Sequence, residues 1–182
     1  PSANPVDLSD YALARVSNAP TTSGVYEYWV DFDPGSVILP GDVYVVCHGS
    51  ASDEIQAECD QTFTYLSNGD DVFALTQVGT GTVLDVIGLV GDDPGSGWDV
   101  AGVSNATKDH TLVRKATVMT GNPLWLDNTE TGEAGSAGTN EDDSEWIVFD
   151  QNTWDYVGFH PHDFSSDVMG CMDETACNYN AD

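Results

Sequence analysis

The chain has 182 residues and a formal net charge of −27, because its 31 Asp and Glu residues outnumber 4 Lys and Arg residues. Its 40% of hydrophobic residues can form a buried core, which excludes a wholly disordered chain. So few cations argue against direct nucleic-acid binding, and the apolar runs are too short for membrane insertion. The acidic surface suits a saline or calcium-containing medium, although simple solubility explains it equally well.

Short β-strands separated by turn residues are predicted along most of the chain. Apolar residues alternate with polar ones, or form short runs, between clusters of Gly, Pro, Asn and Asp. The predicted strands cover residues 11–16, 25–32, 43–47, 62–66, 71–77, 82–89, 111–115 and 145–149, and residues 36–39 lie between two turns. One short helix is expected over 51–58, since Ser52 can cap it and Asp53 and Glu54 suit its first turn. Strands this short indicate an all-β sandwich or barrel.

Two segments break this pattern. Residues 129–144 contain no large apolar side chain, so we expect a long, acidic and mobile surface loop there. After Phe164, residues 165–167 form a polar linker, and 170–182 begin a separate small module. The expected domains are therefore a β-sandwich over 1–164 and a linker with the start of a Cys-containing module over 165–182.

The four cysteines, Cys47, Cys59, Cys171 and Cys177, favour disulfides, because neither pair has the CxxC spacing of a zinc site. Cys47 ends a predicted strand and Cys59 precedes the next, so we expect a bond between them, worth about 2–3 kcal/mol. Disulfides indicate an oxidising, extracellular compartment, whereas free thiols in a cytosolic protein are the alternative. Asn105 begins an Asn-Ala-Thr sequon for N-glycosylation, which matters only if the source has that machinery.

A series of motifs carries a family resemblance. NPVDLSDYAL at 4–13, LPGDVYVV at 39–46, NGDDVFAL at 68–75 and VLDVIG at 83–88 resemble, in this order, the motifs of lamin-tail domains. DDPGSGW at 92–98, HTLVRK at 110–115, EW at 145–146 and DYVGFH at 155–160 are similar to the subtype that precedes the catalytic part of secreted bacterial nucleases. The resemblance implies an immunoglobulin-like antiparallel β-sandwich without catalytic residues, because the chemistry of those nucleases resides in a separate domain.

The resemblance also raises the question of a missing strand. Family members begin with a further strand just before the position of Pro1. A sandwich without that strand exposes unpaired backbone and an apolar groove. Either upstream residues or another copy of the chain would then fill the groove.

Residues 170–182, GCMDETACNYNAD, resemble the opening of a Cys-containing repeat of secreted and surface proteins. A module this small needs a disulfide or a bound cation to become ordered, and calcium prefers oxygen ligands. The candidate calcium ligands are Asp173, Asn178, Asn180 and Asp182. Cys171 pairs either with Cys177 or with a downstream cysteine. The pairs Asp53-Glu54 and Asp70-Asp71 are weaker calcium candidates, and solvated acids are the alternative throughout.

No motif points to catalysis. The histidines, His48, His110, His160 and His162, lack the spacing of a zinc site, and no G-x-S-x-G motif marks a nucleophilic serine. We therefore expect no enzyme activity. A flat exposed row of aromatic residues would bind sugar rings, whereas packing within the sandwich is the alternative explanation for the many aromatics.

These features together predict a non-catalytic extracellular or cell-surface module that acts in docking, spacing or assembly. It would serve as an accessory domain of a larger secreted protein or as a structural subunit. The expected partners are other domains of the same protein or further copies of the chain. The alternatives are a carbohydrate- or ligand-binding module, and a subunit of an extracellular filament assembled by strand exchange.

Overall fold

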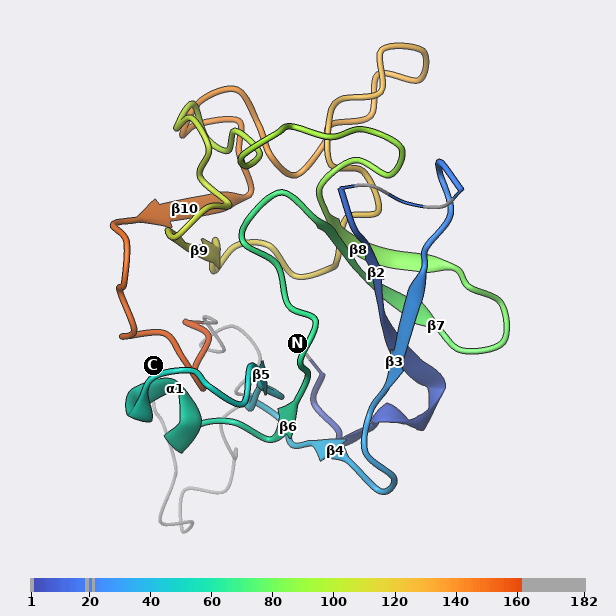
Figure 1. The fold of residues 1–182 in the computed structure, drawn as a ribbon, viewed down its shortest axis with the longest axis vertical. Helices are drawn as coiled ribbons and strands as arrows, with labels where there is room; N and C mark the ends of the chain where they lie inside the picture. Colours follow the sequence, from blue (N-terminus) through green and yellow to red (C-terminus); the bar gives the residue numbers. More distant parts are fainter. Residues whose placement is uncertain (1, 19, 21, 162–182) are drawn as a thin grey trace, which may run out of the picture.

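A computed structural model describes residues 2–18, 20 and 22–161 and confirms the predicted all-β class. The strands are β1 (Val6–Asp7), β2 (Tyr11–Val16), β3 (Tyr28–Asp31), β4 (Val37–Ile38), β5 (Val46–Cys47), β6 (Gln61–Thr62), β7 (Val72–Gln77), β8 (Val83–Ile87), β9 (Thr111–Arg114) and β10 (Trp146–Phe149). A short 3-10 turn, η1 (Leu8–Asp10), and one short helix, α1 (Asp53–Ala57), complete the described part. In Figure 1 the four-stranded sheet occupies one side of the molecule, and the β5–β6 and β9–β10 pairs occupy the other.

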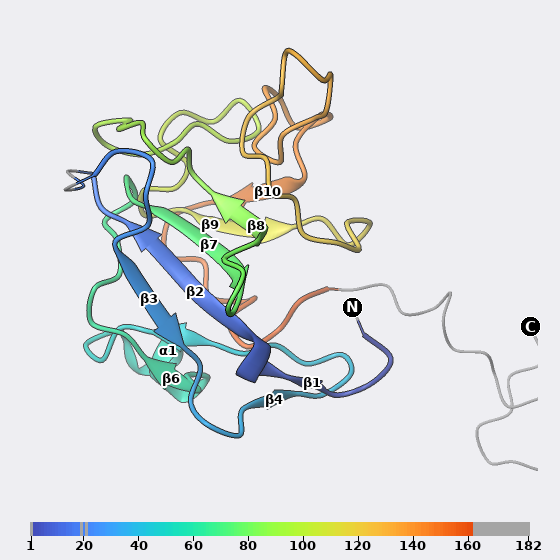
Figure 2. The same ribbon diagram turned by 90° about the vertical axis from the view of Figure 1, so that its right-hand side faces the viewer.

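The central sheet has the order β3-β2-β7-β8 and is antiparallel throughout (Figure 2). Strands β2 and β7 pair over their whole length, from Tyr11 opposite Gln77 to Val16 opposite Val72. A tight turn joins β7 to β8, where the Gln77 N–H donates to the Thr82 carbonyl at 2.9 Å. Gly79 and Gly81 both have positive φ in this turn, which explains the two glycines and confirms the predicted hairpin.

Alternation in β2 and β7 separates two faces of this sheet. One residue in two is buried, and the residues between are half-buried or, at the end of β7, exposed. The buried residues Ala14, Val16, Val72 and Ala74 belong to a core cluster. The other members of that cluster are Val86, Trp98, Val100, Ala106, Trp125, Ala137 and Trp146. The small side chains of the strands thus leave room for large aromatic rings.

Three strand pairs lie outside the central sheet. The β9–β10 and β1–β4 pairs are antiparallel, whereas β5 and β6 are parallel, a departure from the predicted all-antiparallel pattern. Parallel strands require a crossover connection rather than a hairpin, and α1 provides it. The helix is shorter than predicted, and the Ser52 side chain makes no capping hydrogen bond.

The prediction of a surface loop over residues 129–144 is wrong for its central part. Ser136 and Ala137 have no exposed surface, and their N–H groups donate to the carbonyls of Leu124 and Trp125. The reason is the small size of the side chains here. A Cβ added to Gly135 would lie 2.3 Å from the Leu126 carbonyl carbon, so only glycine allows this close backbone approach.

Candidate functional site

An apolar groove opens where the β1–β4 pair meets the beginning of β2. Its cavity volume is about 370 Å³. The apolar and aromatic residues that line it are Val6, Leu8, Tyr11, Phe32, Ile38, Leu39, Tyr44 and Leu75, and the polar ones are Ser2, Asn4 and Asp42, with Gly41 beside them. An opening of this size with a mainly apolar lining is typical of a binding site for apolar groups.

Local sequence signals build the first wall of the groove. Asp7 ends β1 and caps η1, because its carboxylate accepts the Ser9 N–H at 2.9 Å. The same hydrogen bond holds the pKa of Asp7 below its usual range. Leu8 follows, buried, and its N–H donates to the Ser36 carbonyl at 3.0 Å, which holds η1 against the segment before β4.

Two predicted turns shape the opposite wall. At Asp33-Pro34-Gly35 the Ser36 N–H donates to the Asp33 carbonyl, and at Pro40-Gly41-Asp42 the Asp42 N–H donates to the Leu39 carbonyl, both at 3.0 Å. The glycine of each turn has a positive φ. The two turns flank β4, which pairs with β1 so that Val6 lies opposite Ile38.

An aromatic pair closes one end of the groove. The rings of Phe32 and Tyr44 meet edge to face, with centroids 5.3 Å apart. The Tyr44 hydroxyl accepts from Ser36 at 3.1 Å and donates to Gln61 Oε1 at 3.0 Å. Gln61 also donates to the Asp31 carbonyl at 3.0 Å, so this end is held in place by a continuous hydrogen-bond network.

Acidic residues adjoin the lining of the groove along the chain, and we call them its rim. Exposed aspartates adjoin the lining residues along the chain; they are Asp7, Asp10, Asp31, Asp33 and Asp42. Between residues 2 and 47 the sequence has a single Lys or Arg, Arg15, whose side chain is 11% exposed and is paired with Asp71. No exposed cation in this segment therefore neutralises the aspartates.

Both strands beside the groove have an open edge. Strands β1 and β4 pair only with each other among the described strands, so each leaves its other edge without a strand partner. Val37 and Leu39 are 45% and 56% exposed. The site therefore combines apolar surface with free strand edges.

The predicted cysteine pair is confirmed. Cys47 and Cys59 form a disulfide with a Cα–Cα distance of 5.7 Å, and it joins the end of β5 to the segment just before β6. The predicted sites at Cys171, Cys177, Asp173, Asn178, Asn180 and Asp182 lie outside the described residues, as do His162 and the second predicted domain.

Asn105, the glycosylation candidate, is exposed and has a positive φ of 54°. Thr107 of the same sequon is engaged: its hydroxyl donates to the Gly69 carbonyl and accepts the Trp98 N–H. The asparagine side chain is thus accessible, whereas the threonine forms part of the packing between two loops.

The Asp70-Asp71 pair, a weaker calcium candidate, is occupied mainly by protein partners. Asp71 pairs with Arg15 and accepts the Asn18 N–H, and the Asn18 amide donates to Asp70 at 3.0 Å. Asp53 and Glu54, the other pair, occupy the first turn of α1. Among residues 2–18, 20 and 22–161, no group of three or more His, Cys, Asp or Glu side chains is arranged to hold a metal ion.

The described histidines are spread over three segments. His48 Nδ1 accepts the Ser50 N–H, and His110 Nδ1 lies 2.9 Å from the Lys108 carbonyl. His160 lies at the C-terminal end of the described chain, where partial burial lowers its pKa.

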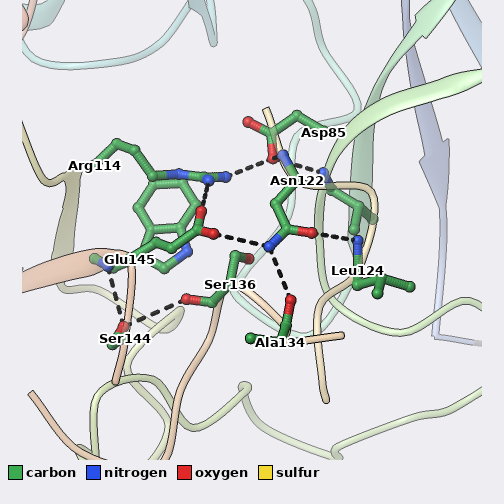
Figure 3. Close-up of polar contacts among 10 residues, drawn as sticks. Asp85, Arg114, Asn122, Leu124, Ala134, Ser136, Ser144 and Glu145 are labelled. Carbon is green, nitrogen blue, oxygen red and sulfur yellow. Dashed lines mark hydrogen bonds and ion pairs between the residues drawn. The ribbon is translucent and has the colours of Figure 1, made fainter. Parts of the chain in front are cut away.

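A polar network around Arg114 is a feature that sequence reasoning missed (Figure 3). Arg114 pairs with Asp85 of β8 and with Glu145, the residue before β10. Its guanidinium also lies 4.1 Å from the centroid of the Trp146 ring. Asn122 extends the network, since its amide donates to Glu145 at 2.8 Å and to the Ala134 carbonyl at 3.1 Å.

The Arg114 network connects the long loops and contains no reactive group. Arg114 is held on both sides by carboxylates, and Asn122 joins residues 121–124 to residues 134–145. The partners are separated by 29 and 31 positions in the sequence, so no local motif indicates the contact. These contacts join the loop segments that contain Trp125 and Ala137, two members of the core cluster.

The aromatic residues around β3 do not form one flat row. Tyr28 stacks on Tyr65, with ring centroids 5.8 Å apart, and Arg15 lies over the Tyr28 ring. Trp29 is the next residue, so it points to the opposite face of the strand, where it contacts Tyr26 edge to face. Tyr28, Trp29 and Tyr65 are exposed, but they lie on two faces and form no single flat platform for sugar rings.

No helix in the described part of the chain is long and apolar enough to cross a membrane. No protein-family model matches the chain, and neither a curated protein nor a solved structure is significantly similar to it. The likeness to lamin-tail domains therefore stays a prediction from motifs.

Proposed function

We propose that the chain is a non-catalytic docking and assembly module of an extracellular or cell-surface protein, with the apolar groove as its binding face. The observation that carries this proposal is the groove itself. Its apolar lining is open to solvent beside β1 and β4, which each have one edge without a partner among the described strands. Apolar surface and open strand edges of this kind are features through which proteins dock with extended segments of other chains.

The disulfide and the surface charge support the extracellular part of the proposal. A disulfide between Cys47 and Cys59 forms and persists in oxidising compartments. The net charge of −27 keeps the chain soluble and opposes non-specific contact with nucleic acid and anionic lipids. The partners we propose are another domain of the same secreted protein or a further copy of the chain.

The lamin-tail resemblance also supports a structural, non-catalytic role. It implies an immunoglobulin-like sandwich whose chemistry, where there is any, lies in a separate domain. The all-β fold agrees with such a sandwich in class. We propose that the module presents the groove while other parts of the protein carry any activity.

Photo-crosslinking tests the docking role. A photoreactive residue is placed at Leu39 in the groove and, as the control, at Leu126, which is 49% exposed outside it. The full-length protein is irradiated in its native medium, and crosslinked peptides are identified by mass spectrometry. We expect position 39 to crosslink to another domain or another chain and position 126 not to do so. Equal or absent crosslinking at both positions would contradict the proposal.

A further inference from the structure

We infer that the occupant of the groove is an extended apolar segment that is flanked by Lys or Arg residues and is supplied by another domain of the secreted protein rather than by a second copy of this chain. The inference rests on the proposed docking function and adds the chemistry of the partner. Three properties of the described chain carry it: the apolar lining, the open strand edges and the uncompensated charge of the rim.

The lining and the edges define the shape of the occupant. A cavity of about 370 Å³ admits apolar side chains but not a folded domain. The open edge of β1 or β4 offers backbone donors and acceptors to an extended chain. In an added strand alternate side chains point the same way, so every second residue of the partner enters the groove.

The rim defines the charge of the occupant. Asp42 lines the groove, and the exposed Asp10 and Asp33 are neighbours in the chain of the lining residues Tyr11 and Phe32. The one Lys or Arg of residues 2–47 is Arg15, which already pairs with Asp71. An apolar segment has little charge of its own, so the rim acts on the residues before and after it. Lys or Arg residues at those positions are attracted by the aspartates of the rim, whereas Asp or Glu residues are repelled.

The same argument disfavours the chain's own C-terminal segment and a second copy. Residues 162–182 contain no Lys or Arg, and their charged residues are all acidic. A second copy would bring another net charge of −27 to the contact. Arg114 lies in β9, which is already paired with β10, and its guanidinium is held by Asp85 and Glu145.

Matched peptides test this inference with the full chain. The first peptide has an alternating Val-Thr core with two Lys at each end. The second has the same core with Glu ends, and the third has Lys ends on a Gly-Ser core. Affinities are measured by isothermal titration calorimetry at low and high salt, with the disulfide and the circular dichroism spectrum as folding controls.

We expect the Lys-ended Val-Thr peptide to bind, and the Glu-ended one to bind at least about tenfold more weakly at physiological salt, with the difference shrinking at high salt. The Gly-Ser peptide should not bind. The variant L39S should lower affinity at least about tenfold, whereas L126S, at a similarly exposed leucine outside the groove, should not. The double variant D10N/D33N should weaken the Lys-ended peptide, whereas E130Q/D155N should not.

The possible results separate the two proposals. Equal binding of Lys-ended and Glu-ended peptides, still sensitive to L39S, overturns the charge inference and leaves the docking groove standing. Binding of the Gly-Ser peptide, or binding that L39S does not change, overturns the inference because the groove is then not the site. Absence of any binding contradicts both proposals. A dimer that persists at low salt and is abolished by L39S overturns the inference in favour of a second copy.

Discussion

The two faces of the central sheet differ in a way that side-chain size alone does not predict. Strands β2 and β7 direct Ala12, Ala14 and Ala74 to the buried face and place Leu13 and Leu75 on the half-buried one. The smaller residues are thus the better buried. Burial on this sheet depends on what covers each face: Ala14 and Ala74 share a core cluster with tryptophan rings, whereas the groove opens beside Leu75.

The two faces of the sheet differ in packing and in proposed function. The alanine face lies in a closely packed cluster with Trp98 and Trp125, whose rings meet edge to face at 6.5 Å. Such a region specifies one structure and leaves no room for a ligand. The other face retains apolar surface that a partner can cover. The first region therefore accounts for stability and the second for the proposed binding.

The largest expected effect is on the alanine face. Trp125 is 2% exposed, so W125A should leave a cavity and lower the free energy of unfolding by about 3–5 kcal/mol. The matched control is W29A, since Trp29 is 51% exposed, and it should cost about 1 kcal/mol or less. Urea denaturation followed by circular dichroism measures both. Similar losses for the two variants would show that the comparison between regions is mistaken.

The disulfide gives the next largest effect and lies on the groove side. Replacing both cysteines, C47S/C59S, removes a link across 12 residues and should cost about 3 kcal/mol. We expect the loss to appear first around β5, α1 and β6 in hydrogen exchange, with the Trp125 region still protected. Uniform loss of protection over the whole described chain would argue against separate behaviour of the two regions.

Breaking the Arg114 network should have a somewhat smaller effect on the free energy of unfolding. R114M leaves Asp85 and Glu145 without their cation and should cost about 2–3 kcal/mol, less than for a fully buried pair because both carboxylates are partly exposed. The neighbouring variant K115M serves as the control and should cost less than 1 kcal/mol or so. Thermal unfolding at neutral pH measures the difference, and equal shifts in the two variants would contradict the role given to Arg114.

The smallest effect concerns pH. Burial lowers the pKa of His160 below the ordinary value near 6.5, so the unfolded chain binds a proton at higher pH than the folded chain does. Stability should therefore be unaffected by His160 above that ordinary value and should fall slightly as the pH drops through it. H160Q should remove this acid-side decrease in urea unfolding at pH 7 and pH 5. An unchanged pH dependence in H160Q would exclude the effect.

Local patterns predicted much of the fold. The alternation in residues 11–16 and 71–77 predicted β2 and β7, and Gly79 and Gly81 predicted the turn after β7, because strand faces and positive φ are properties of neighbouring residues. The disulfide was predictable for the same reason, since Cys47 and Cys59 flank one short connection.

Contacts between distant segments were not predictable in this way. Arg114 finds Asp85 and Glu145 only after the chain has folded back, and the buried part of residues 129–144 depends on backbone packing around Gly135. The polar composition of this segment indicated an exposed loop. Its small side chains, however, also allow two backbone segments to approach closely. The family resemblance implied an apolar groove at the place of a missing first strand, and that stays a prediction. No local motif indicated the position of this groove, because its walls come from four separate stretches of chain.

The most direct test of the proposed function is an NMR titration of the ¹⁵N-labelled full chain with the Lys-ended Val-Thr peptide. We predict that amide shifts change at Val6, Leu8, Ile38, Leu39 and Leu75, around the groove, while the amides near Trp125 stay unchanged. Shifts centred elsewhere, or no shifts at peptide concentrations up to the millimolar range, would contradict the account of the groove as the binding face.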